Sequence, residues 1–309
     1  MTATVTHRLP MILDEVEAVR IDRISPSFVR VELGGPALAD FGVDGPLYDQ
    51  RIKLIFPVAG RMPSLAGADE TWLTTWRQRP VEERGHMRTY TVREVRGTGP
   101  DTRLVVDFVL HEADAAAGPG SAWAAAARLG DRLVVLAPRR GAAFGGIEFM
   151  PGAAGRLLIA ADETAVPAAC SILADLPPDA RGAVFLEVPM TADVQRVPSP
   201  TGVEVVWLPR DGAPLGSLLG PAVLAHLGAA PVIEEPTEVE PDLWETPSYS
   251  SSGEPVEGLA TTPDQRDLYA WIAGESAVVT ALRRALVGEL GLDRRQVAFM
   301  GYWRRGVAG

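Results

Sequence analysis

The sequence predicts two domains of different architecture, an antiparallel β-barrel in the first half and a parallel α/β sheet in the second. The chain has 309 residues, about twice the usual size of one domain. Up to residue 152, apolar residues fall in short β-rich runs separated by turns, a pattern typical of barrels. From residue 153 onward, apolar runs alternate with helical segments, as in doubly wound sheets. We therefore expect domains at residues 1–152 and 153–309.

Composition excludes several classes of protein. The formal net charge of −11 argues against nucleic acid as a partner, because binding its phosphates requires a basic surface. Cys170 is the single cysteine, so an internal disulfide and sites built on several thiolates are excluded. No signal-peptide pattern and no 20-residue apolar run occurs. We expect a cytoplasmic monomer with no membrane insertion and no metal bound by protein side chains.

The first half opens with short strand patterns at residues 16–21 and 28–33, followed by residues 51–56. The third pattern alternates polar and apolar residues, which places Arg51 and Lys53 on one face. Lys53 is the only lysine of the chain. It is either a functional cation or a chance survivor on a solvated strand. The following irregular segment contains Trp72 and Trp76, four residues apart, which favours a short helix.

A second alternating stretch runs from Arg88 to Arg93, ahead of a strand at residues 103–110. Arg88 and Tyr90 share one face of such a strand, and Thr89 and Thr91 share the other. A phenol ring stacks on a flat ring system, and a guanidinium matches phosphate oxygens. This face therefore suits a planar ring that carries a phosphate. The alternative is a solvated Arg beside a half-buried Tyr.

The stretch Gly118-Pro119-Gly120-Ser121 precedes a predicted helix over residues 122–128, and a strand follows at residues 132–136. Ser121 is the expected N-cap. The glycines allow close approach of the backbone, and the start of a helix binds anions such as pyrophosphate. The alternative is an ordinary capped helix. Together with the Arg88 strand, the stretch favours a flat ring joined to a pyrophosphate, which is a flavin dinucleotide.

The second half contains five predicted strands and two long predicted helices, and ligands of such sheets bind at the carboxyl ends of the strands. Three polar groups fall at such ends, and they are Asp162 to Thr164, Gly274-Glu275 and Tyr302-Trp303-Arg304. No Gly-x-Gly-x-x-Gly follows the first strand, so the sequence does not support an orthodox Rossmann site. The predicted strands cover residues 156–160, 183–188, 203–208, 268–273 and 296–300. The stretch at residues 162–167 opens one predicted helix, which runs through residue 176, and the other predicted helix covers residues 277–290.

An acidic segment near residues 229–262 interrupts this pattern with glutamates among prolines and serines. Such composition is typical of a solvated insertion. A lid with Trp244 and Tyr249 as docking points is the alternative.

The whole chain resembles the ferredoxin-reductase-like flavoproteins, and more specifically the siderophore-interacting protein family of flavin-dependent ferric-siderophore reductases. Seven short motifs carry the resemblance in the same order along the chain. They are Arg51-Ile52-Lys53-Leu54 with Phe56-Pro57, Arg88 to Arg93, Phe108 to His111, Gly118 to Ser121 with Trp123-Ala124, Ala161 to Ala165, Ala273-Gly274-Glu275, and Gly301 to Gly306.

The resemblance implies a six-stranded antiparallel FAD-binding barrel followed by a parallel-sheet domain that resembles NAD(P)H-binding domains. It implies three sets of site residues. On the barrel, FAD would contact Arg88, Thr89, Tyr90, Thr91, His111, Gly118, Gly120, Ser121 and Trp123. From the second domain, Asp162, Glu163, Thr164, Gly274, Glu275 and Trp303 would face the flavin and the nicotinamide. The anionic ferric siderophore would contact Lys53, Arg139 or Arg140, and Arg304.

The function implied is reduction of ferric siderophores. NADPH or NADH would give a hydride to FAD, which would pass single electrons to chelated Fe(III) and so release Fe(II). One alternative is a protein that binds flavin or siderophore without turnover. Others are a flavoprotein reduced by a ferredoxin-type partner and a reductase of free flavins. The sequence does not decide between the two nicotinamide nucleotides, and Arg196 and Arg210 are the candidate contacts of a 2′-phosphate.

Overall fold

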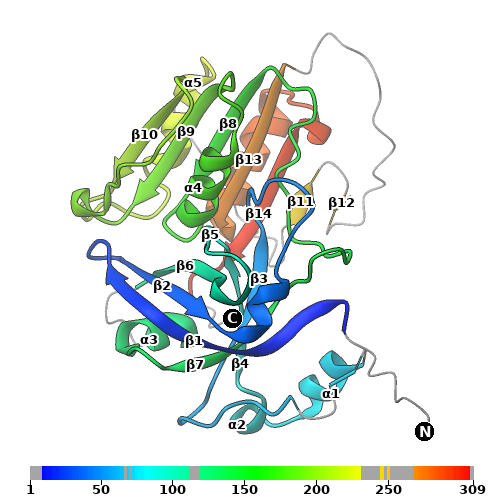
Figure 1. Cartoon of the computed structure of the whole chain (residues 1–309). Coiled ribbons are helices and arrows are strands. Elements are labelled where there is room, and N and C mark those ends of the chain that lie inside the picture. Colours follow the sequence, from blue (N-terminus) through cyan, green and yellow to red (C-terminus); the bar gives the residue numbers. More distant parts are fainter. Residues whose placement is uncertain are drawn as a thin grey trace, which may run out of the picture.

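The computed structural model describes residues 9–65, 68–69, 71–110, 118–230, 244–246, 249–250 and 267–306. The chain forms two sheets, one above the other in Figure 1, with helices around each. The acidic segment predicted near residues 229–262 lies almost wholly outside the described residues, so its role stays a prediction. No helix among the residues described is long and apolar enough to cross a membrane.

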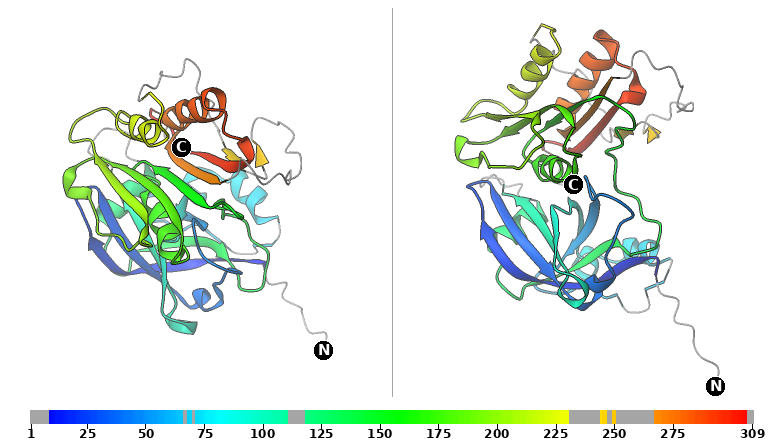
Figure 2. Two further views of the ribbon diagram at one scale, coloured as in Figure 1. Left: turned by 90° about the horizontal axis from the view of Figure 1, so that it is seen from above. Right: turned by 45° about the horizontal axis from the view of Figure 1, so that its top comes forward.

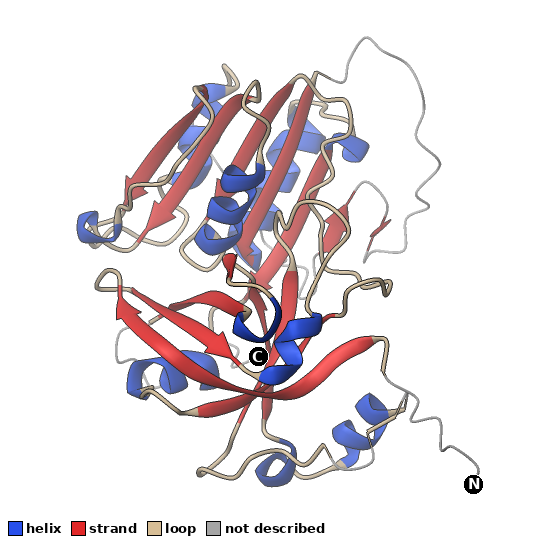
Figure 3. Cartoon of the chain, viewed as in Figure 1, coloured by secondary structure: helices blue, strands red, loops and turns tan. Residues whose placement is uncertain are grey.

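The first sheet is antiparallel and strongly curled, as Figure 3 shows. It forms a half-barrel, which confirms the predicted antiparallel architecture, and the three-residue strand β5 brings the number of strands to seven. Their order is β4-β3-β7-β1-β2-β6-β5. The strands are β1 (Met11–Arg23), β2 (Phe28–Gly34), β3 (Arg51–Phe56), β4 (His86–Thr91), β5 (Glu94–Arg96), β6 (Arg103–Val109) and β7 (Arg132–Pro138).

The two faces of this sheet bury different side chains. The inner face packs Ile52 and Leu54 of β3 into the main apolar core of the sheet. Ile55 points the other way, toward Trp72 and Trp76. These tryptophans belong to α1 (Trp72–Gln78), the predicted short helix, which is followed by α2 (Val81–Arg84). The helix α3 (Pro119–Ala126) packs near the inner face.

The second sheet has the predicted parallel core, in the order β10-β9-β8-β13-β14, with the antiparallel pair β11-β12 at its edge. Figures 1 and 2 show helix α4 on the face toward the first sheet, and α5 and α6 on the far face. A π-helical stretch, Arg284–Glu289, continues α6. The strands are β8 (Arg156–Ala161), β9 (Arg181–Val188), β10 (Gly202–Pro209), β11 (Trp244–Thr246), β12 (Tyr249–Ser250), β13 (Leu268–Glu275) and β14 (Val297–Trp303), and the helices are α4 (Val166–Asp175), α5 (Leu219–His226) and α6 (Ser276–Arg283).

The two sheets share buried contacts. Phe28, which is 0% exposed, and Phe149 belong to the same apolar cluster as helix α4. The buried carboxylate of Asp193 accepts hydrogen bonds from the hydroxyl groups of Ser25 and Ser27 and from the Ser27 amide, at 2.7, 2.8 and 2.9 Å. Asp49 accepts a bond of 3.0 Å from the Trp271 indole of β13. The division at residue 152 stays a prediction, and these contacts tie the two parts together.

Candidate functional site

Tyr90 and Arg88 lie on the inner face of the β3–β4 ribbon, as predicted, because they pair with Ile52 and Leu54. The Tyr90 ring packs against Phe108, with 4.5 Å between the ring centroids and 47° between the planes. Burial raises the pKa of the Tyr90 phenol, so the hydroxyl stays protonated and can donate a hydrogen bond. The inner face therefore offers a phenol ring set in an aromatic cluster.

Arg88 is a cation held partly out of water. Its guanidinium donates to the backbone carbonyl of Met87 at 2.8 Å. Burial lowers the pKa of Arg88, which shows that its charge is held at some cost. Among the residues that the structure describes, no carboxylate forms an ion pair with Arg88. This arrangement suits an anionic ligand that would neutralise the guanidinium.

The beginning of α3 differs from the sequence prediction. The helix begins at Pro119 with Gly118 as N-cap, so Ser121 is not the N-cap and instead lies buried in the first turn. The reason is that proline fits the first helical position, where its missing amide costs no hydrogen bond. The amides of Gly120 and Ser121 then belong to the turn in which a helix supplies no acceptor.

Gly120 allows this helix to approach Tyr90 closely. A Cβ atom at position 120 would lie 1.9 Å from the Tyr90 hydroxyl oxygen and 3.2 Å from Phe56. Trp123, one turn further along α3, completes the aromatic cluster, with 5.7 Å between its centroid and that of Phe56. An aromatic cluster, a cation without a carboxylate partner among the described residues, and first-turn amides thus occur on this part of the first sheet. These features fit a flavin with a pyrophosphate, and His111 lies outside the described residues.

Lys53 and Thr89 occupy the opposite, outer face of the ribbon, where the Lys53 ammonium donates to the Thr89 hydroxyl at 2.5 Å. Burial, and then the charge of Arg51, lowers the pKa of Lys53. Thr89 is exposed, whereas Thr91 is buried at the end of β4. Thr89 is therefore separated from Tyr90 by the plane of the ribbon.

Arg51 links this outer face to the second sheet. Its guanidinium carbon lies 4.2 Å from the ring centroid of Trp244, and Trp244 in turn stacks on Tyr302 at 5.9 Å. Arg51 also pairs with Glu148. Because Tyr302 is near the end of β14, this chain of contacts connects the outer face of β3 to the end of β14. Sequence reasoning placed Arg51 beside Lys53 but missed this contact between the two sheets.

The other predicted substrate cations differ in their surroundings. Arg139 forms an ion pair with Asp40 at 2.8 Å and also donates to the carbonyls of Leu9 and Met11. Arg140 is exposed and donates to the carbonyl of Phe41 at 3.1 Å, and Arg304 is exposed at the end of β14. Arg139 therefore holds the chain together locally, and Arg140 is the better placed of the two for an external anion.

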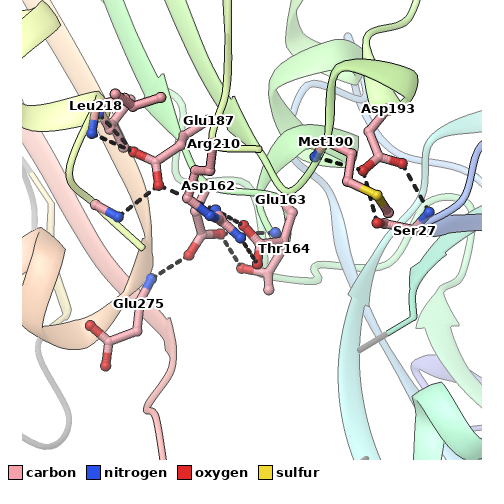
Figure 4. Close-up of polar contacts among 12 residues, drawn as sticks. Ser27, Asp162, Glu163, Thr164, Glu187, Met190, Asp193, Arg210, Leu218 and Glu275 are labelled. Carbon is pink, nitrogen blue, oxygen red and sulfur yellow. Dashed lines mark hydrogen bonds and ion pairs between the residues drawn. The ribbon is translucent and has the colours of Figure 1, made fainter. Parts of the chain in front are cut away.

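The predicted residues of the second domain come together around Asp162, which is fully buried at the end of β8 (Figure 4). Its carboxylate accepts from the amide and hydroxyl of Thr164 at 2.8 and 2.6 Å. It also accepts from the Glu275 amide at 2.7 Å and from the Trp303 indole at 2.9 Å. Gly274 is required there, since a Cβ would lie 2.6 Å from the Asp162 carboxyl carbon.

The pKa of Asp162 is raised to about 7, first by burial and then by the charge of Glu163. Glu163 itself pairs with Arg210, whose nitrogen atoms lie 2.7 and 3.1 Å from its two oxygens. Arg210 also lies 3.2 Å from Glu187 of β9 (Figure 4). The sequence indicated Arg210 as a candidate but not its pairing with Glu163. It did not indicate Glu187, because a single glutamate within a strand carries no distinguishing signal.

The chain has a ferredoxin-reductase-like fold. A ferredoxin reductase of carbazole 1,9a-dioxygenase shares the fold, with a TM-score of 0.55 at 17% identity over 96% of this chain and 70% of the other. The model of the siderophore-interacting FAD-binding domain matches residues 17–142, and that of the siderophore-interacting protein matches residues 154–306. The chain belongs to the siderophore-interacting protein family.

Relatives match nearly the whole chain. An uncharacterized protein of Mycobacterium tuberculosis (strain H37Rv) is 33% identical over 95% of this chain and 91% of its own length. Ferric vibriobactin reductase ViuB of Vibrio cholerae is 29% identical over 99% and 93%. The crystal structure of a siderophore utilization protein from T. fusca superposes with a TM-score of 0.66 at 31% identity, covering 97% and 95%. NADPH-dependent ferric-chelate reductase of Escherichia coli is 31% identical over 50% of this chain and 53% of its own.

Proposed function

We propose that this protein reduces ferric siderophores, with bound FAD as the redox group and a nicotinamide nucleotide as the electron donor. The observation that carries the proposal is the close approach of the start of α3 to Tyr90, on the face of the β3–β4 ribbon that also carries Arg88. Arg88 is a partly desolvated cation without a described carboxylate partner, and it shares a strand face with Tyr90, which meets the first turn of α3 at Gly120. The names of ViuB and of the Escherichia coli relative support the same chemistry.

The barrel residues would hold the flavin by charge and shape. Arg88 would neutralise phosphate oxygens, and the first-turn amides of α3 would donate to the pyrophosphate. Tyr90 would contact the ring system, with Phe56 and Phe108 packed against the phenol and Trp123 packed against both of these rings. Thr91 and Gly118 lie at the ends of the two elements that would form the pocket. When bound, FAD takes up a hydride and releases its electrons one at a time.

The second domain would bring the donor to the flavin at the carboxyl ends of β8, β13 and β14. There Asp162 fixes Thr164, the Gly274-Glu275 turn and the Trp303 indole in one rigid arrangement. Such an arrangement positions a nicotinamide ring and keeps water from it. The roles of these residues, and of Glu163, rest on their place at this edge.

The substrate would bind on the outer face, at Lys53, Arg140 and Arg304. Ferric siderophores with carboxylate donors are anions, so exposed or partly buried cations attract them. Lys53 is suited to this role because its short, flexible ammonium adapts to ligands of different shape. Iron would stay in its chelator until reduced, since hard oxygen donors hold Fe(II) more weakly than Fe(III).

An anaerobic visible spectrum of the purified, FAD-loaded protein tests the proposal. Stoichiometric NADH or NADPH is added first, and the ferric complex of a carboxylate siderophore follows. We expect the flavin absorbance to bleach and then to recover on addition of the ferric complex. If the flavin stays oxidised with both nucleotides but is reduced by a ferredoxin, the electron donor is a ferredoxin-type protein and not a nicotinamide nucleotide. A protein that binds no FAD would contradict the proposal entirely.

A further inference from the structure

The carboxyl ends of the strands in the second sheet, where a nucleotide would bind, carry both carboxylates and an arginine. Ligands of doubly wound sheets bind where the strand order reverses, which here is between β8 and β13. In such folds a carboxylate near the adenosine ribose favours NADH, whereas an arginine there receives the 2′-phosphate of NADPH. Arg210 follows β10 at this edge, while the exposed Arg196 lies in the segment that returns to the amino end of β10. Of these two candidate contacts of a 2′-phosphate, Arg210 is therefore the one that lies at the carboxyl ends of the strands.

Arg210 is already neutralised. Glu163 engages both terminal nitrogens of its guanidinium, and Glu187 contacts one of them as well. The side chains of Arg210, Glu163 and Glu187 are 11%, 5% and 0% exposed. Two carboxylates against one guanidinium leave a net charge of −1. A phosphate could take Arg210 only by removing the guanidinium from two nearly buried carboxylates, which is strongly unfavourable.

The helix starts at this edge are occupied as well. Glu187 accepts from the amides of Leu218 and Leu219 at the start of α5, at 3.2 and 2.7 Å. Glu275 accepts from those of Ala277 and Val278 at the start of α6, at 2.7 and 3.2 Å. Asp162 accepts from the Thr164 amide ahead of α4. Amides that bind dinucleotide phosphates in other folds are thus bonded to carboxylates of this chain.

We infer that the ion cluster of Glu163, Arg210 and Glu187 makes this edge select NADH over NADPH, because it repels the adenosine 2′-phosphate. The inference rests on the proposed nicotinamide donor. It assigns Glu163 and Glu187 the role of specificity determinants. The 2′-phosphate carries a charge of about −1.5 to −2, so its repulsion by a cluster of net charge −1 corresponds to about tenfold weaker binding at low salt.

Calorimetric titration of the FAD-loaded protein with the oxidised nucleotides NAD⁺ and NADP⁺ tests this selection without turnover. We expect NAD⁺ to bind about tenfold more tightly at low ionic strength. The difference should shrink in part at high salt, since salt screens the accessible 2′-phosphate while the nearly buried cluster is screened less. Glu163→Gln removes one negative charge and should reduce the difference to about twofold.

Glu204→Gln is the matched control, because Glu204 is an exposed carboxylate near the amino end of β10. This variant should keep the parental ratio. Equal or tighter binding of NADP⁺, binding of neither nucleotide, or a ratio that salt does not change would overturn the inference. If Glu163→Gln does not fold, the salt dependence of the NAD⁺/NADP⁺ affinity ratio in the parent protein still tests the inference. Reduction by dithionite followed by reoxidation with the ferric complex tests flavin chemistry separately.

Discussion

At the scale of single residues, the site depends on the charge of Arg88 and on the missing side chain of Gly120. Arg88 keeps its guanidinium partly out of water without a described carboxylate, and Gly120 leaves room that Tyr90 uses. The sequence predicted that Arg88 and Tyr90 share a face, since strand alternation is a local property. It placed the N-cap wrongly at Ser121, although Gly118-Pro119 was the better local signal.

Gly120→Ala should lower FAD affinity by at least about tenfold, because its methyl group would displace the Tyr90 phenol or the helix start. Gly288→Ala is the matched control, since a Cβ there meets nothing within 4 Å and this exposed residue lies outside the proposed FAD pocket. Flavin fluorescence during titration of the apoprotein measures both. Adding Tyr90→Phe to Gly120→Ala should recover part of the loss, as it removes the closest atom. Equal FAD affinity in both glycine variants would show that the close approach is not needed.

Lys53→Ala should weaken binding of an anionic siderophore by roughly three- to tenfold, with FAD content unchanged. A gallium(III) complex of a carboxylate siderophore gives the affinity without redox turnover. Arg132→Ala, which removes an exposed cation at the far end of β7, is the control. If both variants bind the complex equally well, Lys53 does not contact the substrate.

The same titration should depend on pH. Burial and Arg51 lower the pKa of Lys53, so its ammonium begins to lose its proton at a lower pH than an exposed lysine. The affinity for the anion should then be constant in acid and fall as the pH rises through that pKa. In Lys53→Arg the guanidinium stays charged, and the alkaline fall should disappear. A fall of the same size in this variant would assign it to another group.

At the scale of elements, the strand ends of the second sheet were predictable and their mutual bonds were not. The pattern of apolar runs placed Asp162, Glu275 and Trp303 at one edge. Their convergence on a single carboxylate depends on residues more than 100 positions apart in the chain. The pairing of Arg210 with Glu163 likewise follows from the three-dimensional order of β10, β9 and β8.

Asp162→Asn should flatten the dependence of stability on pH. A buried carboxyl with a pKa raised to about 7 favours the folded state while it is protonated. That contribution is present below about pH 4 and is lost as the pH rises toward 7. Urea unfolding between pH 5 and 8 measures the slope, with the exposed Asp179→Asn as control. Parallel profiles for parent and Asp162→Asn would mean that Asp162 does not titrate in this range.

At the scale of the whole molecule, the relative position of the two sheets depends on buried polar contacts. Asp193 bonds to Ser25 and Ser27, and Asp49 bonds to Trp271. These pairs are 166 to 222 residues apart in the sequence. No periodicity or local motif marks them, so the sequence predicted the two architectures but not how they meet.

Asp193→Ala should lower the free energy of unfolding by about 2–4 kcal/mol, since it leaves buried donors of the first sheet without an acceptor. Asp193→Asn keeps an acceptor oxygen and should cost less. Urea unfolding followed by tryptophan fluorescence measures both changes. A loss under about 0.5 kcal/mol for Asp193→Ala would show that the contact does not stabilise the interface.

The position of Phe28 limits how this protein can be recombined with its relatives. Phe28 begins β2 of the first sheet, yet its ring is fully buried in the cluster that covers helix α4. A chimera that combines the first half of one homologue with the second half of another would therefore need residue 28 to fit the α4 cluster of the other protein. A substitution at Phe28 should require compensating substitutions in the α4 cluster, so the two halves are expected to evolve together.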